Sequence, residues 1–134
     1  MAAALACGIA PLRAATVEVR FSGLPNDDGH ALFALFAEAS GFPDRAESAV
    51  ARIEGPVSGG RADVVFENVV PGDYALSALH DANESGAIDL NLFGVPKETF
   101  AVSNVAKGRP TWPQARFSVG EDDLVIELEP LRFY

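Results

Sequence analysis

The sequence predicts an all-β fold: an antiparallel Greek-key β-sandwich of about seven short strands with one long ordered loop. Three observations support this prediction. Several stretches alternate apolar with polar residues, as strands with one buried face do. Clusters of Gly, Pro, Asn and Asp separate these stretches and indicate turns. The chain also has no sustained helical periodicity and no internal repeat.

The first two strands are predicted within residues 16–37. Residues 16–22 alternate, with Val17, Val19 and Phe21 on the apolar face. The turn-forming residues 25–29 follow, and the short apolar run 30–37 then reads as a strand buried on both faces. We expect these two strands to pair with each other as a hairpin.

The middle of the chain predicts a helical turn and two further strands. Residues 44–51 contain good helix formers, and a strand is expected at 50–57. Pro56 places that strand at a sheet edge, because proline cannot donate to a β-ladder. Residues 58–60 form a turn, and a strand follows at 61–69. Its inward-facing residues are predicted to be Ala62, Val64, Phe66 and Val69.

A tight turn at 71–74 leads into a strand at 74–80. The alternation of this strand places Tyr74, Leu76, Ala78 and His80 on one face, and Ala75, Ser77 and Leu79 on the other. No regular structure is assigned to 81–113, which is long for a connection and is expected to be an ordered, functional loop. Strands are expected again at 115–119 and 124–128, around an acidic turn at 121–123.

Length and composition restrict the classes of function. The 134 residues, 49% of them hydrophobic, suffice for one domain, predicted to span 16–134. A formal charge of -9 argues against nucleic acid and anionic membranes as partners, leaving an unknown protein or glycan. Cys7 is the single cysteine, so an intramolecular disulfide and a thiolate metal site are excluded.

Residues 1–15 are small and apolar and read as the remnant of a signal peptide, which predicts a secreted or periplasmic protein. The apolar run is too short for a membrane span, which needs about 20 residues. No basic residue precedes the run, and Arg13 stands three positions before a cut after Ala15. The alternative is therefore a disordered Ala-rich leader on a cytoplasmic protein.

The segment that follows the strand at 74–80 carries oxygen-bearing residues at nearly every second position. Such a spacing lets a short loop wrap a hard cation such as Ca²⁺, with glycine at position 86 permitting the bend. The candidate metal ligands are Asp81, Asn83, Ser85, the backbone carbonyl of Ala87, Asp89 and Asn91. Because Leu92 stands where an EF-hand has its bidentate carboxylate, the expected affinity is weak, with Kd on the order of 10⁻⁴ to 10⁻³ M. Glu84, Glu98 or the acidic turn at 121–123 would add a further carboxylate.

The same segment has other interpretations. Asp, Asn, Ser and Gly also form loops through local hydrogen bonds to the backbone, without any ion. His30 and His80 together with Asp81 would offer imidazole nitrogens to a transition metal. No nucleophile elbow or phosphate-binding loop is present, so no catalytic and no cofactor-binding residue is assigned.

Aromatic residues of the long loop offer a second candidate surface. Trp112 stands between two prolines, and with Phe93, Phe100 and Tyr134 it would present a platform to a glycan or protein. The alternative, which we favour, is that these rings cover one end of the sandwich, because a long loop must bury apolar groups to be ordered.

One stretch resembles a known family. The resemblance to the DUF2141 family of exported bacterial proteins spans about residues 16–129, and its specific part lies at 80–104. The matching residues are His80-Asp81, Asn83, Gly86, Asp89, Asn91, residues 93–98 and Ser103-Asn104. Residues 66–81 resemble, more broadly, a strand pair of transthyretin-like and carboxypeptidase-regulatory-like sandwiches, which also implies an Ig-like architecture. The resemblance implies export and a small sandwich, and it assigns no catalytic residue. Family members often have the sequence Asn-Gly-Asn-Gly in this loop. This chain has Asn83-Glu-Ser-Gly86 instead, and Ser85 is a poorer ligand.

From these observations we expect an exported, non-catalytic binding or accessory module that binds Ca²⁺ weakly through 81–91. One alternative is a small hydrolase or isomerase that uses acidic residues and histidine near the long loop. Another is a structural or adhesive protein-interaction domain, for which an uncovered edge strand would be the sign.

Overall fold

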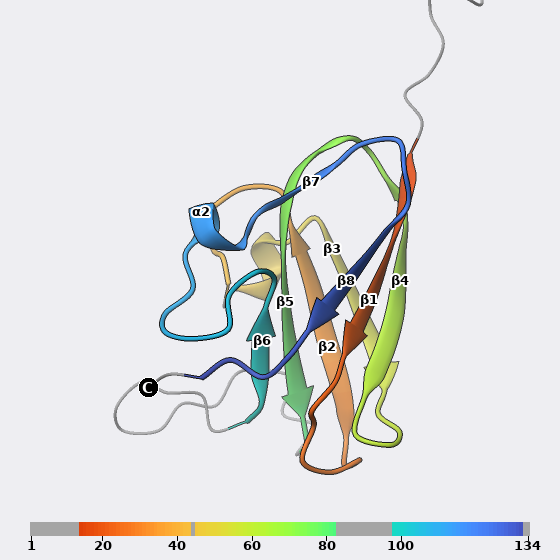
Figure 1. The fold of residues 1–134 in the computed structure, drawn as a ribbon, viewed down its shortest axis with the longest axis vertical. Helices are drawn as coiled ribbons and strands as arrows, with labels where there is room; N and C mark the ends of the chain where they lie inside the picture. Colours follow the sequence, from red (N-terminus) through yellow and green to blue (C-terminus); the bar gives the residue numbers. More distant parts are fainter. Residues whose placement is uncertain (1–13, 44, 83–97, 133–134) are drawn as a thin grey trace, which may run out of the picture.

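Two β-sheets pack face to face in the computed structural model (Figure 1), which describes residues 14–43, 45–82 and 98–132. The first sheet has the strand order β4-β1-β8, with bounds Ala62–Val69, Ala15–Phe21 and Leu124–Leu128. The second has five strands, in the order β3-β2-β5-β6 with β7 also pairing with β5. Their bounds are Ala51–Pro56, His30–Phe36, Gly72–Asp81, Phe100–Val102 and Phe117–Val119. Two short helices complete the described elements, the 3₁₀ helix η1 at Ala46–Ser48 and α2 at Trp112–Ala115.

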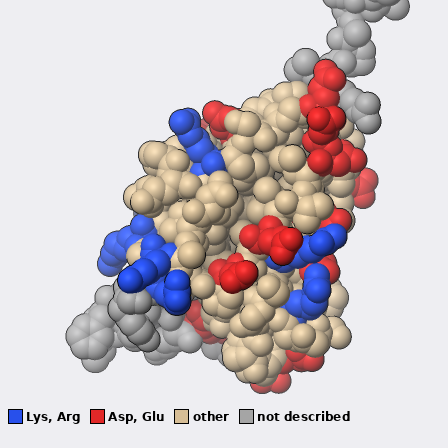
Figure 2. Space-filling model, in the orientation of Figure 1, with Lys and Arg blue, Asp and Glu red and all other residues tan. Residues whose placement is uncertain are grey.

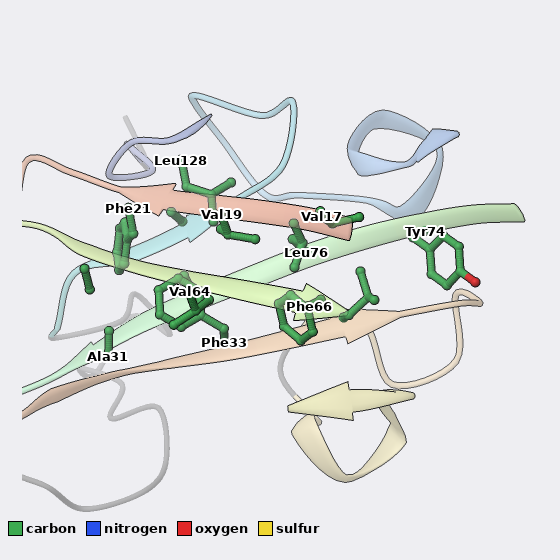
Figure 3. Close-up of a cluster of buried hydrophobic side chains, with 14 of the residues drawn as sticks. Val17, Val19, Phe21, Ala31, Phe33, Val64, Phe66, Tyr74, Leu76 and Leu128 are labelled. Atoms are coloured by element: carbon green, nitrogen blue, oxygen red, sulfur yellow. The ribbon is translucent and has the colours of Figure 1, made fainter. Parts of the chain in front are cut away.

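The main core lies between the two sheets (Figure 3). The inward-facing residues of β1 are completely buried, and Phe21 meets Phe33 of β2 edge to face, with ring centroids 6.1 Å apart. Burial of such side chains contributes roughly 1.5–3 kcal/mol each. The alternating pattern of each strand therefore supplies one wall of this core.

A second apolar cluster covers the outer face of the five-stranded sheet. Leu79 and Phe100 are buried there, and Leu131 reaches them from the C-terminal segment. The N–H of Leu131 donates to the carbonyl oxygen of Phe100 at 2.7 Å. Because this sheet is covered on both faces, β5 has no wet side, and its residues from Tyr74 to Asp81 are all buried.

Much of the predicted strand pattern is confirmed. The four residues of 61–69 expected to face inward are all buried, and Pro56 ends β3 at the edge of its sheet. The two faces predicted for 74–80 also separate: Tyr74, Leu76 and Ala78 join the main core, whereas Ala75 and Leu79 join the outer cluster.

The hairpin expected at 16–37 is wrong. β1 pairs with β4 and β8, whereas β2 pairs with β3 and β5 in the other sheet. The two strands face each other across the core, as the contact between Phe21 and Phe33 shows. Each has an apolar face that must be buried, and two sheets packed face to face bury both faces at once.

Two further expectations need correction. The sandwich is not wholly antiparallel, because β1 and β8 run parallel. The segment 81–113, to which the sequence pattern assigns no regular structure, contains β6 and the start of α2, while its residues 83–97 lie outside the described part of the chain. The eight strands of the described residues are close to the expected number, and the short helical turn expected within 44–51 is present as η1.

The leader predicted at residues 1–15 lies mostly outside the described residues. Its last residue, Ala15, begins β1, where it is buried and pairs with Val69. None of the described helices is long and apolar enough to cross a membrane.

Candidate functional site

The candidate site lies at the end of the five-stranded sheet where β2 begins and β5 ends. His30 and Asp81 stand directly opposite each other there in the antiparallel pair. The chain enters β2 through Gly29, whose φ of +63° glycine adopts without the steric cost of a side chain. A Cβ atom at this position would overlap the carbonyl oxygen of Asp81. The turn before β2 thus packs directly against the end of β5.

Two carboxylates flank the imidazole of His30. Its Nε2 lies 3.0 Å from Oε2 of Glu54 on β3 and 3.7 Å from Oδ2 of Asp81 on β5. Asp81 is 0% exposed, whereas the side chain of Glu54 is 64% exposed. The imidazole therefore lies between one solvated and one buried carboxylate.

His80 belongs to the opposite face of the sheet. It is paired with Ala31, one position along from the pair of His30 and Asp81, so its side chain points toward the main core. The imidazole is 1% exposed, and its Nε2 lies 2.7 Å from the carbonyl oxygen of Asp28. An N–H at Nε2 donates to this oxygen, which closes the turn before β2 over the end of the core.

The transition-metal hypothesis for the two histidines is therefore not supported by the register, since the sheet backbone separates His30 from His80. Within the described ranges, no group of three or more His, Cys, Asp or Glu residues is arranged to hold a metal ion.

The residues on either side of 83–97 meet at this site. Oε2 of Glu98 accepts a hydrogen bond of 2.8 Å from the N–H of Ala82, and the N–H of His80 donates to the carbonyl oxygen of Thr99 at 2.8 Å. Residues 98 and 99 are thus held against the end of β5. Glu98 is also one of the carboxylates that the sequence offers as a further ligand.

Of the predicted calcium ligands, the structure places Asp81 alone. It is the last residue of β5, and its carboxylate is buried. The other ligand positions, Asn83, Ser85, Ala87, Asp89 and Asn91, lie outside the described residues.

Sequence reasoning missed Glu54. Its approach to His30 depends on β3 pairing with β2, and strand pairing is not encoded in the alternation of either strand. One indirect sign of this contact is present in the sequence. A strand that ends at Pro56 is expected at a sheet edge, and an edge strand has one neighbouring strand.

A carboxylate clamp holds the neighbouring turns together. Asp27 accepts hydrogen bonds from the N–H of Gly60 at 2.8 Å and of Gly59 at 3.0 Å. These bonds favour the ionised form, so the pKa of Asp27 is lowered, the bond from Gly60 contributing most. The clamp connects the turn before β2 to the turn between β3 and β4, on the same end of the molecule.

The proposed aromatic platform is partly described. Phe100 is 5% exposed and belongs to the outer cluster. Trp112 packs edge to face on Phe42 at 6.0 Å, and Phe42 packs in the same way on Phe36 at 5.2 Å. Phe93 and Tyr134 lie outside the described residues. For Phe100 and Trp112, this packing agrees with the alternative that the rings cover the sheet.

Comparisons with known proteins agree with the family resemblance. No curated protein matches the chain. A solved structure of a pilus-presented adhesin, a cysteine-to-alanine mutant, aligns with 94% of this chain at 10% identity and a TM-score of 0.27, which is too low to support any argument. This chain covers 29% of that adhesin's length. The model of the DUF2141 family, described as an uncharacterized protein conserved in bacteria, matches residues 19–127. The chain therefore belongs to the DUF2141 family.

Proposed function

We propose that the protein is an exported, non-catalytic binding module that binds a calcium ion weakly where β5 ends. The observation that supports this most is the carboxylate of Asp81, which is completely buried at the start of the oxygen-rich segment. A carboxylate held in a fixed place at the end of a strand is a ready oxygen ligand for a hard cation.

Two further carboxylates belong to this end of the sheet, although they form no metal-holding cluster with Asp81 within the described residues. Glu98 accepts a hydrogen bond from the N–H of Ala82, and Glu54 lies 3.0 Å from His30. Ca²⁺ takes six to eight oxygen ligands. The oxygens of the residues that follow Asp81 in the sequence would complete the shell: Asn83, Ser85, the carbonyl of Ala87, Asp89 and Asn91. Among the six proposed ligands only Asp81 and Asp89 are carboxylates, so the affinity should lie in the weak range of extracellular modules.

Calorimetric titration with CaCl₂ tests this proposal. The wild-type protein should give a saturable heat with Kd on the order of 10⁻⁴ to 10⁻³ M. The heat should disappear in the double variant Asp81→Asn with Asp89→Ala. Asp89→Ala alone keeps the buried residue and should weaken binding, which guards against misfolding of the double variant. The control is Asp63→Asn, which removes an exposed carboxylate on β4. No heat from wild type at millimolar Ca²⁺, or unchanged heat in the double variant, would reject the calcium site.

Export is the second part of the proposal, and it rests on the sequence of residues 1–15 and on the family resemblance. We also propose that the sandwich has the Greek-key, transthyretin-like topology which that resemblance implies. Fractionation of the source cells, with the gene under its own upstream region, should place the protein in the periplasm or medium. Recovery in the cytoplasmic fraction alone would favour the cytoplasmic alternative.

A hydrolase or isomerase is the competing function, and one observation favours it. His30 lies close to two carboxylates, Glu54 and Asp81, as a general base and its orienting groups do. However, Asp81 is completely buried, so a substrate would reach only His30 and Glu54. Hydrolysis of a panel of model esters and peptides that is lost in His30→Gln would support this alternative, and calcium binding that persists in the same variant would keep the two proposals distinct.

A further inference from the structure

Strand β8 is an edge strand that lacks proline, lysine and a bulge. Among the described residues it pairs with β1 alone, in a regular parallel register from Leu124 to Leu128. Natural edges are commonly blocked by proline, lysine or a β-bulge. The sequence of β8, LVIEL, contains neither of these residues, and its register shows no bulge.

The inward side chains of β8 are incompletely covered. Val17 and Val19 of β1 are 0% exposed, whereas their direct partners on β8, Leu124 and Ile126, remain partly exposed although they face the same core. The difference arises because β1 has a neighbour on both sides and β8 on one side only. A strand added at the free side would cover Leu124 and Ile126.

The chain crosses between the sheets before and after β8, and no described strand pairs with β8 on the side away from β1. Before β8, strand β7 pairs with β5 of the other sheet. After β8, Leu131 bonds to Phe100 of β6. Figure 1 shows these two crossings above and below β8.

The direction of the backbone groups follows from one hydrogen bond. The carbonyl oxygen of Leu128 accepts from the N–H of Ser22, so the peptide groups of Leu128 point toward β1. Because directions alternate along a strand, the N–H and C=O groups of Val125 and Glu127 point away from the sheet. No described residue forms a backbone hydrogen bond with them outside the sheet. These two residues offer four groups to an incoming strand.

Charge determines which strand would fit. The segment 121–129 has five acidic residues and no Lys or Arg: Glu121, Asp122, Asp123, Glu127 and Glu129. Pairing β8 with β8 of a second copy would bring these carboxylates together, which opposes a homodimer. Figure 2 shows acidic side chains along one edge and in the middle of the face in view. A partner strand with Lys or Arg would gain from the same charges.

We propose that β8 is a docking site for an extended segment of a partner protein in which apolar residues alternate with Lys or Arg. The partner's backbone pairs with Val125 and Glu127, its apolar side chains cover Leu124 and Ile126, and its cations meet Glu127 and Glu129. This is β-strand addition, in which main-chain hydrogen bonds give affinity and alternate side chains give specificity. The surface belongs to the three-stranded sheet, so its use does not depend on the calcium site.

The test uses a seven-residue peptide of alternating lysine and valine, acetylated and amidated, titrated into the ¹⁵N-labelled full chain. We expect saturable shifts at β8, with the amides of Val125 and Glu127 becoming protected from hydrogen exchange. Val125→Pro removes an outward N–H that is not used within the sheet, and it should weaken binding by about tenfold or more, as expected for the loss of a main-chain hydrogen bond and its neighbours. A peptide of alternating glutamate and valine should not bind.

Val125→Lys should also weaken binding, and it serves if the proline variant fails to fold. Its matched control is Val65→Lys, the same change at an exposed valine on β4 across from Glu18. The proposal would be overturned if the lysine peptide bound equally well to wild type and to both Val125 variants. It would also be overturned if chemical shifts changed without protection of the amides of Val125 and Glu127. Either result would mean that the peptide is held by charge attraction alone. A β8-dependent dimer in analytical ultracentrifugation would also overturn it, by making a second copy the occupant.

Discussion

Ser103 donates a hydrogen bond of 2.6 Å from its hydroxyl to the carbonyl oxygen of Ala115, the last residue of α2. The same Oγ accepts a hydrogen bond of 3.0 Å from the N–H of Leu76 in the middle of β5. Ser103 is 0% exposed, so both bonds lie away from water. One hydroxyl thereby fixes the C-terminal end of α2 to the strand that leads into the candidate site.

Ser103→Ala should destabilise the fold by about 1–3 kcal/mol, because it leaves a buried donor on Leu76 and a buried acceptor on Ala115 without this partner. Urea unfolding measures the change. Ser118→Ala is the control, since the bond from its hydroxyl to Asp73 is exposed; its effect should stay within about 0.5 kcal/mol. Equal losses in the two variants would contradict the importance given to burial.

Tyr74 closes the turn that precedes β5. Its hydroxyl donates to the carbonyl oxygen of Val70 at 2.7 Å, four residues upstream, as in the tyrosine corner of other sandwiches. Tyr74→Phe should therefore cost about 0.5–1.5 kcal/mol in the free energy of unfolding at neutral pH. Tyr74→Leu, which also removes the ring, should cost more. A Phe variant as stable as wild type would mean that solvent replaces this bond at no cost.

The stability contributed by Tyr74 should also depend on pH. Burial raises the pKa of Tyr74 above its ordinary value of 10.0. The contribution is fully present below the unfolded pKa and is lost as the pH rises through the folded pKa. The difference in unfolding free energy between wild type and Tyr74→Phe should therefore shrink above pH 10. A difference that stays constant in denaturant titrations from pH 8 to pH 11 would refute this.

Asp27 should stabilise the fold at neutral pH and not in acid. Its pKa is lowered by the bonds from Gly60 and Gly59, so its contribution is present above the ordinary value of 3.8 and disappears as the pH falls through the folded value. Asp27→Ala should lower the melting temperature at pH 7 and have little effect below that range. Asp28→Ala is the control, because Asp28 accepts from His80 through its backbone carbonyl. A deficit of equal size at both pH values would argue against the clamp.

The alternation of single strands was enough to predict which side of each strand faces the main core. Val17, Val19 and Phe21 face the core as expected, because a period of two allows one apolar face per strand. Partner choice was not predictable in this way. β1 pairs with β4 and β8, whose sequences lie far along the chain. The sequence of the turn before β2 is compatible both with a hairpin and with a crossing to the other sheet.

The candidate site was likewise predictable only where its features are local in the sequence. Asp81 was found because it ends a clear strand and begins an oxygen-rich segment, both of which are local features. The position of His30 between Glu54 and Asp81 required the register of three strands, which no local pattern specifies. Sequence alone therefore suggested an ion site on one loop and two imidazoles beside Asp81. The structure keeps His30 next to Asp81, places His80 on the other face of the sheet, and adds Glu54 from β3.

Phe42 should control the environment of Trp112, the single tryptophan of the chain. Its ring packs edge to face between Phe36 and Trp112, so Phe42→Ala removes the surface on which the indole lies. Tryptophan emission should shift to longer wavelength as water reaches the ring, and stability should fall by about 2–4 kcal/mol, somewhat less than for a fully buried Phe. Val70→Ala, at a 52% exposed position, should change neither quantity. In an aromatic platform for a partner, the indole of Trp112 would already be exposed to water in the wild type. An unchanged emission maximum in Phe42→Ala would therefore favour the platform. A clear red shift would favour rings that cover the sheet.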